Sequence, residues 1–260
     1  MMRIFVEGIG ILAPGLEGWP STREVLANTR PYEPRPVSAP SAGLLPPAER
    51  RRAGLTVRLA MAVGIEALGQ AQRASQEMPM VFATSGGDGE TIHEILTVLA
   101  TEQREVSPTR FHNSVHNAPS GYWALATGSR APSVSLSAYD DSFAAGLLEA
   151  AVQVTVHDTP VTLIAYDVPY PPPLHAARPV AATFGTALVL APHGSERTLA
   201  SLTVAMADFP QSTTRMLDPE LERLRLANPA ARALPLLAAM ARGDGGMIHL
   251  NEIDVAVAAL

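Results

Sequence analysis

Residues 131–151 read APSVSLSAYDDSFAAGLLEAA, and this stretch decides how the chain folds. Apolar and small side chains alternate with serines as far as Ala138, which is the period of a β-strand. From Ser142 onward the apolar residues recur at helical spacing. The stretch therefore predicts a strand, a tight turn and a helix. We expect Asp140 and Asp141 to lie in the turn and to cap the free N–H groups at the start of the helix.

Composition narrows the classes of protein to which this stretch can belong. The chain has 260 residues, is 47% hydrophobic and contains no cysteine, which excludes a disulfide scaffold, a thiolate metal site and a cysteine nucleophile. Its formal net charge of −6 offers no basic field for nucleic acid. We find neither a signal peptide nor an apolar run of membrane-spanning length. We therefore expect a cytoplasmic protein without membrane insertion.

The predicted turn resembles the nucleophile elbow of the β-ketoacyl synthases, which have the thiolase fold. That elbow typically reads G-P-S-x-S-x-x-x-A-C-x-S, and its cysteine accepts the acyl group. Residues 131–135 and Ser142 align with the pattern without a gap. The resemblance places Asp140 at the position of the cysteine and Tyr139 at a position that is usually small. It therefore implies a protein that keeps the elbow and lacks its catalytic group.

A second resemblance lies at residues 111–123, which read FHNSVHNAPSGYW. This sequence is similar to the corresponding segment of the ketosynthase-type proteins of bacterial aryl polyene clusters, in which the segment lies close to the dimer interface. The resemblance to ketosynthases extends over roughly residues 1–192. Beyond it, the two histidine motifs of a complete ketosynthase, H-G-T-x-T and N-S-F-G-F-G-G-x-N, are missing.

The fold class that we expect is α/β, as a thiolase-like half-fold with a mixed five-stranded sheet between helical layers. We predict a ketosynthase-like N-terminal domain over residues 1–192 and a reduced C-terminal α+β cap over residues 193–260. In the cap, the pattern predicts helical structure over residues 219–242 and one last strand over residues 247–258. Near the start of the chain, Ser21 and Glu24 form a candidate capping box for a short helix.

The function that the resemblance implies is that of a chain length factor. Such a protein is a noncatalytic subunit that pairs with an active β-ketoacyl synthase and helps to shape its acyl tunnel, here in aryl polyene or polyketide biosynthesis. It would meet the acyl carrier protein only indirectly, and it would form a homodimer when alone. Tyr139 is expected to block the chain's own acyl pocket. The residues expected at the partner interface and acyl tunnel are Phe111, His112, Asn113, His116, Asn117, Tyr139, Asp140, Asp141 and Phe143.

Two other functions remain open at this point. One is an independent hydrolase or acyltransferase that uses Ser142 or Ser120 with His112 or His116 and an aspartate, although no G-x-S-x-G elbow occurs. The other is a homodimeric scaffold without a tunnel. We expect neither a cofactor nor a metal: His112 and His116 are spaced as helical ligands, but the sequence places no third ligand beside them.

Overall fold

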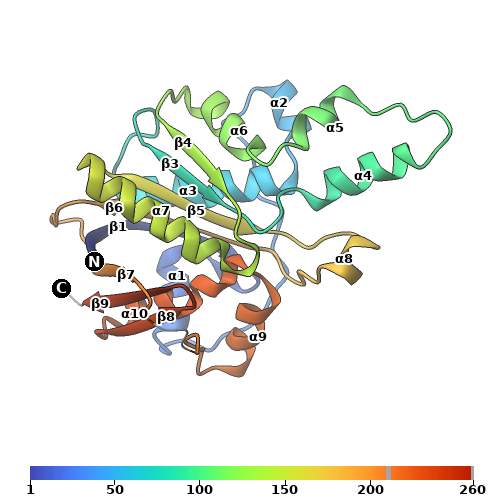
Figure 1. Ribbon diagram of the computed structural model, residues 1–260. Coiled ribbons are helices and arrows are strands. Elements are labelled where there is room, and N and C mark those ends of the chain that lie inside the picture. The colour runs from blue at the N-terminus through green and yellow to red at the C-terminus, as the bar shows by residue number, and fades with distance from the viewer. Residues whose placement is uncertain (209–211, 259–260) are drawn as a thin grey trace.

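The protein is built around one mixed, nine-stranded sheet (Figure 1). The computed structural model describes residues 1–208 and 212–258. The strand order is β4-β3-β5-β6-β1-β7-β9-β8, with β2 paired to β1 off this path. The strands are β1 Met2–Ala13, β2 Leu16–Glu17, β3 Met80–Ala83, β4 Ser133–Leu136, β5 Val161–Asp167, β6 Phe184–Ala191, β7 Ala200–Met206, β8 Gly246–Leu250 and β9 Ile253–Ala258.

Residues 1–192 form the expected mixed sheet. Strands β4, β3 and β5 run parallel, and β6 and β1 follow antiparallel to their neighbours. The sheet is nevertheless larger than the five strands predicted. The long strand β1 pairs with β6 along residues 5–12 and with β7 along residues 2–6, so the C-terminal strands continue the same sheet. The predicted boundary near residue 192 falls between β6 and β7.

Helices cover both faces of this sheet, as predicted. On one face, α3 (Leu55–Gln70) and α6 (Ala118–Thr127) pack against the strands. Helix α3 lies so close to β1 that a side chain at Gly8 or Gly10 would collide with its backbone. These two glycines therefore allow a close approach of helix and strand.

The other face is covered by helices from distant parts of the chain, which share one apolar core. The largest is α7 (Ser142–His157), whose inner side includes the fully buried Phe143 and Leu147. Beside it pack α1 (Trp19–Leu26), η2 (Ala230–Ala233) and α10 (Leu234–Arg242), and α9 (Pro219–Ala227) precedes η2. The C-terminal helices thus complete the core on this face.

Two segments project from the main body in Figure 1. Helices α4 (Gly89–Leu99) and α5 (Pro108–Asn113) form an arm, which we define as residues 89–113. The connection between β5 and β6 carries the short helix α8 (Leu174–Ala177), and we name residues 168–183 the β5–β6 segment. The short α2 (Pro47–Arg52) precedes α3. No helix in residues 1–208 and 212–258 is long and apolar enough to span a bilayer.

Two local predictions are wrong. The first short helix begins at Trp19, its N-cap is Gly18, and no side chain caps it, so Ser21 and Glu24 do not form a capping box. Residues 247–258 form two strands, β8 and β9, because the chain reverses at Asn251, whose φ of 61° lies in the left-handed region. Asparagine tolerates that region better than most residues, so it favours a turn where the apolar pattern suggests one strand.

Candidate functional site

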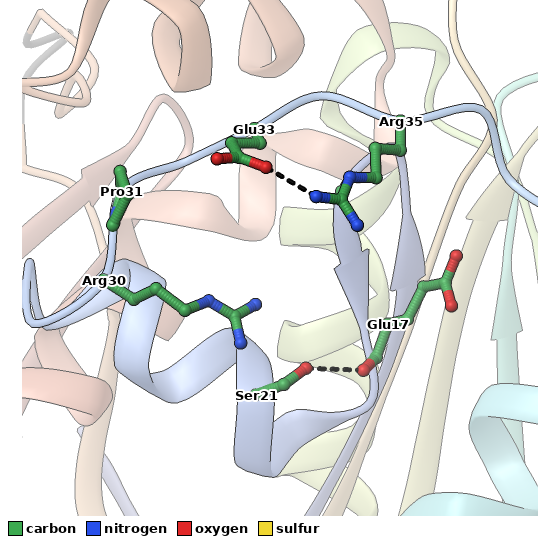
Figure 2. A pocket seen from close by; sticks show the side chains of 7 residues that line it. Glu17, Ser21, Arg30, Pro31, Glu33 and Arg35 are labelled. Carbon is green, nitrogen blue, oxygen red and sulfur yellow. Dashed lines mark hydrogen bonds and ion pairs between the residues drawn. The ribbon is translucent and has the colours of Figure 1, made fainter.

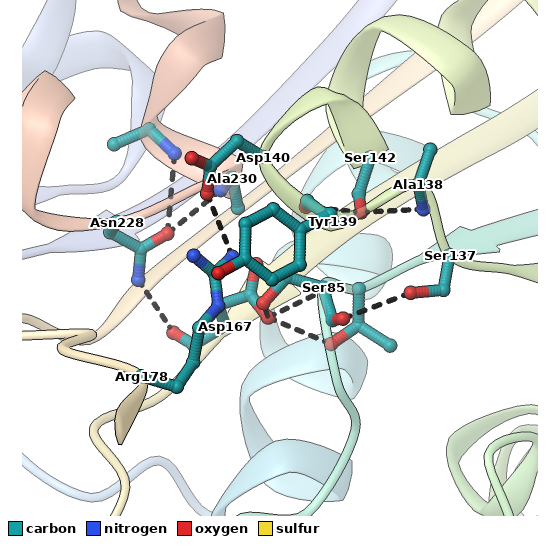
Figure 3. Close-up of polar contacts among 12 residues, drawn as sticks. Ser85, Ser137, Ala138, Tyr139, Asp140, Ser142, Asp167, Arg178, Asn228 and Ala230 are labelled. Carbon is teal, nitrogen blue, oxygen red and sulfur yellow. Dashed lines mark hydrogen bonds and ion pairs between the residues drawn. The ribbon is translucent and has the colours of Figure 1, made fainter. Parts of the chain in front are cut away.

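The predicted elbow joins β4 to α7 through η1 (Tyr139–Asp141). It lies at the carboxyl ends of the parallel strands β3, β4 and β5, since the residues that follow these strands meet there (Figure 3). The hydroxyl of Ser137 donates to the carbonyl of Ser85, which follows β3, at 2.9 Å. In open α/β sheets this end of the strands is the usual place for ligands. The elbow is therefore the first candidate for a functional site.

The backbone of the elbow is strained at Tyr139, whose φ is 53°. A positive φ is rare for an aromatic residue and persists only where the surroundings enforce it. Here Ser142 enforces it: its hydroxyl accepts from the N–H of Ala138 at 3.0 Å and donates to the carbonyl of Tyr139 at 2.8 Å. The buried hydroxyl of Ser142 is thus committed to holding the turn.

The carboxylate of Asp140 forms an ion pair with Arg178 of the β5–β6 segment, at 2.7 Å. The same guanidinium lies over the ring of Tyr139, 3.6 Å from its centroid. Tyr139 is 62% exposed, so its ring covers Arg178 at the surface and does not enter the interior of this chain. Arg178 therefore fastens the β5–β6 segment over the elbow through two neighbouring residues.

Asp141 connects the elbow to the C-terminal hairpin. Asn251, in the turn between β8 and β9, donates from its side-chain amide to the carboxylate of Asp141 at 2.9 Å. Asp141 is the N-cap residue of α7, but its side chain makes no capping hydrogen bond. The prediction that Asp140 and Asp141 cap this helix is therefore wrong, because both carboxylates bind side chains from later parts of the chain.

Asp167, at the end of β5, is a buried carboxylate beneath the elbow. One of its oxygens accepts from the hydroxyl of Thr84 at 2.9 Å, and from the N–H and hydroxyl of Ser85 at 2.9 and 2.8 Å. Burial raises the pKa of Asp167 to about 6, since these hydrogen bonds offset only part of the lost hydration. The side chain ties β5 to the turn after β3, and its carboxyl group keeps its proton to a higher pH than an ordinary aspartate does.

Asn228 joins this cluster to the C-terminal helices. Its amide nitrogen donates to the carbonyl oxygens of Asp167 at 3.0 Å and Ala182 at 2.7 Å, and its amide oxygen accepts from the N–H groups of Ala230 and Ala231. The side chain is buried, so these bonds replace the water that it loses. Asn228 therefore holds both ends of the β5–β6 segment against η2.

The structure separates the other predicted residues into three environments. Phe111 is 69% exposed on the arm, and His112 and Asn117 are also exposed. Asn113 is buried: it donates to the carbonyl of Arg52 at 2.9 Å and accepts from the hydroxyl of Tyr122 at 3.0 Å. His116 is half-buried and Phe143 lies in the core.

Large apolar side chains are exposed on the arm. In α4 only Gly89 and Thr91 are buried, whereas Leu96 is 50% and Leu99 44% exposed. Leu96 and Leu99 lie one helical turn apart and form an apolar surface on α4, and Phe111 on α5 is a further large apolar side chain exposed on the projecting arm. Such surfaces on soluble proteins commonly mark interaction sites. The arm begins directly after the Ser85 turn, beside the carboxyl end of β4.

The serine and metal alternatives gain no support from the contacts. The hydroxyl of Ser120 donates to the carbonyl of Asn117 at 2.9 Å, and that of Ser142 is bonded to Tyr139, so both serines donate to main-chain oxygens and not to a histidine. Within residues 1–208 and 212–258, no group of three or more histidine, aspartate or glutamate side chains is placed to hold a metal ion.

A separate hollow of about 440 Å³ lies at the turn between β1 and β2 (Figure 2). It is lined by Gly15, Glu17, Ser21, Arg30, Pro31, Glu33 and Arg35. Two of its four charges form an exposed ion pair, in which Arg35 lies 2.6 Å from Glu33, and the arginines and glutamates balance. This hollow has neither a net charge nor any residue of the elbow.

Comparison with known sequences and structures identifies the family and the fold. The profile of the β-ketoacyl synthase N-terminal domain matches residues 24–242, which is most of the chain. The chain belongs to the β-ketoacyl synthase family. Among curated proteins, no sequence matches it significantly. The matched region includes the elbow, the arm, the β5–β6 segment and the C-terminal helices.

Solved ketosynthase structures share the fold at low sequence identity. A complex of a ketosynthase (ApeO) with its chain length factor (ApeC) from Xenorhabdus doucetiae matches with a TM-score of 0.73 and 23% identity, covering 99% of this chain and 100% of that chain. The ishigamide ketosynthase/chain length factor matches with a TM-score of 0.68 and 11% identity, over 99% of each chain. A β-ketoacyl synthase from Burkholderia phymatum STM815 has a TM-score of 0.62 and 15% identity, over 89% of this chain and 71% of that chain.

Arg178, Asn228 and Asn251 were not predicted as site residues. Each lies in a loop or an irregular segment, and each acts through a partner that is distant in sequence. A weak signal was present for Asp167, which ends a strand of buried apolar residues. A charged residue at the carboxyl end of a parallel strand is a reasonable site candidate.

Proposed function

We propose that this protein is a cytoplasmic, noncatalytic chain length factor that pairs with an active β-ketoacyl synthase and shapes its acyl tunnel. The observation that carries the proposal is the ion pair between Asp140 and Arg178 at the elbow. The family resemblance puts the acyl-accepting cysteine at the position of Asp140. In this protein, the carboxylate at that position is paired with the guanidinium of Arg178.

The chemistry of Asp140 supports a noncatalytic role. Ketosynthases use a thiolate because sulfur is strongly nucleophilic, and this chain contains no cysteine. A carboxylate is a weaker nucleophile, and its pairing with Arg178 stabilises the ion further. An acyl group on Asp140 would also be a mixed anhydride, which water hydrolyses. The elbow is thus retained as a structural element, and the nucleophile that accepts the acyl group must come from a partner.

The free edge of the sheet supports pairing. Strand β4 ends the strand order, and its outer side has no strand partner among residues 1–208 and 212–258. An open edge pairs readily with a strand of another chain. The arm, which carries the exposed Leu96 and Phe111, starts at the turn that contacts the carboxyl end of the same strand. An edge strand with an apolar arm beside it fits a partner of the same fold.

Two of the solved relatives are described as complexes of a ketosynthase with a chain length factor. A third is described as AntDE:AntF, a type II carrier protein in complex with its ketosynthase bound to the hexaketide, and it covers 100% of this chain and 99% of the matched chain, with a TM-score of 0.71 and 12% identity. The chain therefore has the length of a matched subunit from such assemblies. This agreement in length supports the proposal.

Co-expression with an active ketosynthase tests the proposal. We expect a one-to-one complex in size-exclusion chromatography and products whose chain length depends on this subunit. Phe111→Asp and Leu96→Asp should each weaken the complex at least about tenfold, since a charge would be desolvated in an apolar contact. Leu226→Asp, at an exposed position of α9, is the matched control.

Phe111→Ala and Tyr139→Ala test the tunnel separately, because they leave no new charge in the interface. Each should change the length of the product made by the complex if the side chain borders the tunnel. A stable homodimer that ignores the ketosynthase would refute the proposal and favour a scaffold. A complex with products of constant length would remove the tunnel role from both residues.

A further inference from the structure

We propose that the chain binds a fatty carboxylate, an apolar chain ending in a carboxylate, in a groove at the amino ends of β3, β4 and β5. This groove lies at the opposite end of these strands from the elbow. Three prolines mark it, since Pro79, Pro132 and Pro160 directly precede the three strands. It consists of two hollows of different chemistry that share part of their lining. The inference goes beyond pairing with a ketosynthase.

The first hollow has a volume of about 420 Å³ and a mostly apolar lining, to which Glu149, Gln153 and His157 add polar side chains. Its apolar lining comes from the strand starts and from the outer side of α7. On that helix, Val152 is 39% and Val156 69% exposed, although the opposite side of α7 is buried in the core. The apolar lining residues are Pro79, Pro132, Val152, Val156 and Val161. Burial of this surface by an alkyl chain would be favourable in proportion to the area covered.

The second hollow has a volume of about 370 Å³, and we name it the arginine-lined hollow because Arg73 and Arg197 line it. The buried carboxylate of Glu7 lies beside both guanidinium groups, and with Glu77 in the lining the four side chains carry no net charge. The Nε of Arg73 lies 2.6 Å from one oxygen of Glu7, and the Nη2 of Arg197 lies 3.9 Å from the other. The hydroxyl of Ser195 donates to Glu7 as well, at 2.8 Å. The side chains of Arg73 and Arg197 are 26% and 43% exposed, so guanidinium surface stays open to the hollow.

The two hollows meet at Pro79 and Thr159, which line both. Each volume is in the range of small-molecule sites, about 300–1,000 Å³. Arginine recognises a carboxylate well because its planar fork can donate two parallel hydrogen bonds. A mostly apolar hollow beside two arginines therefore matches a ligand with an alkyl chain and a carboxylate head. Glu77 also lines the arginine-lined hollow, and its carboxylate would repel the carboxylate of the ligand.

Fluorescence titration of the full chain with dansylaminoundecanoic acid tests this site. We expect saturable binding to one site per chain. Val156→Asp and Arg197→Gln should each weaken binding at least about tenfold, the first by placing a charge against the alkyl chain and the second by removing a charged hydrogen bond. Glu77→Gln should tighten binding by a few fold. All three side chains are at least partly exposed, so their replacement leaves the core intact.

Leu226→Asp and Arg35→Gln are the matched controls, because they make the same kinds of change outside the groove. Both should bind the probe as the unaltered chain does. Undecanoate should displace the probe at least about tenfold better than undecanol, which lacks the carboxylate. The proposal is overturned if binding is not saturable or if the groove variants bind like the controls. If undecanoate and undecanol displaced the probe equally well, the proposal would also be overturned, because the arginine-lined hollow would then not recognise the carboxylate.

Discussion

Replacing Arg178 with alanine should loosen the β5–β6 segment from the elbow. Arg178 is the residue through which residues 168–183 contact both Asp140 and Tyr139. Its side chain is only 19% exposed, whereas that of Asp140 is 45% exposed. The substitution removes the ion pair, the stacking on the ring and the packing of the aliphatic stem. We expect the fold to persist, because Asn228 still holds both ends of the segment.

The expected loss is the sum of three modest contributions. The ion pair adds about 0.5 kcal/mol, since solvent screens the half-exposed carboxylate. Stacking over the exposed ring of Tyr139 adds about 0.5–1 kcal/mol, and the partly buried stem of Arg178 adds about 1 kcal/mol. The free energy of unfolding should therefore fall by about 2 kcal/mol. For a chain of this size that loss lowers the melting temperature by about 4–8 °C.

Urea denaturation and hydrogen exchange measure the two consequences. Amides of residues 168–183 should exchange faster in Arg178→Ala, while those of β5 keep their protection. The control is Arg35→Ala, whose ion pair with Glu33 is exposed on both sides, and which should cost less than about 0.5 kcal/mol. Equal losses in the two variants, with unchanged exchange over residues 168–183, would refute the role of Arg178 as the fastening residue.

Three further predictions concern stability. Burial raises the pKa of Asp167 to about 6, above its ordinary value, so the folded state binds the proton more tightly than the unfolded state. The free energy of unfolding should therefore rise by up to about 3 kcal/mol as the pH falls from 7 towards 4. Denaturant titrations at several pH values should show this slope in the difference between the unaltered chain and Asp167→Asn, and a flat difference would contradict the reasoning. Leu147→Ala should lower the free energy of unfolding, measured in urea, by about 2–5 kcal/mol, because the side chain is fully buried. Val156→Ala, at an exposed position of the same helix, should lower it by less than about 0.5 kcal/mol. Similar losses in the two variants would show that the side of α7 with Leu147 does not face the core. Gly10→Ala should destabilise the fold by at least about 1–3 kcal/mol, because a methyl group would meet the backbone of α3. Gly69→Ala should stabilise it by about 0.5–1 kcal/mol, because the surroundings of Gly69 are open. Thermal melts that reversed this order would disprove the close packing of α3 on β1.

The elements with a regular side-chain period were predictable. The change from alternating to helical spacing located the elbow between β4 and α7. Such a period is a property of neighbouring residues, so it is visible without the fold. The turn at Asn251 escaped prediction because the apolar pattern continues on both sides of it.

The partners of the elbow were not predictable in the same way. Asp140 and Asp141 look like helix caps in a strand–turn–helix, because carboxylates at that position usually bind the first N–H groups. In the structure they bind Arg178 and Asn251, which are 38 and 110 residues away along the chain. Arginine pairs with a carboxylate through a charge-assisted hydrogen bond, and the fold brings Arg178 and Asn251 within reach of the two carboxylates. Only the packed chain shows that it does.

The sequence by itself determined the absence of a cysteine, the family resemblance and the elbow, and through the resemblance it predicts Asp140 at the nucleophile position. Local patterns and residue identities carry that information directly. Tertiary structure alone decided that the C-terminal strands extend the sheet, that the apolar side of the arm is exposed, and that Arg73 and Arg197 meet over Glu7. These features depend on contacts between segments far apart in the chain. No period in the sequence encodes such contacts, because they arise only when the core brings the segments together.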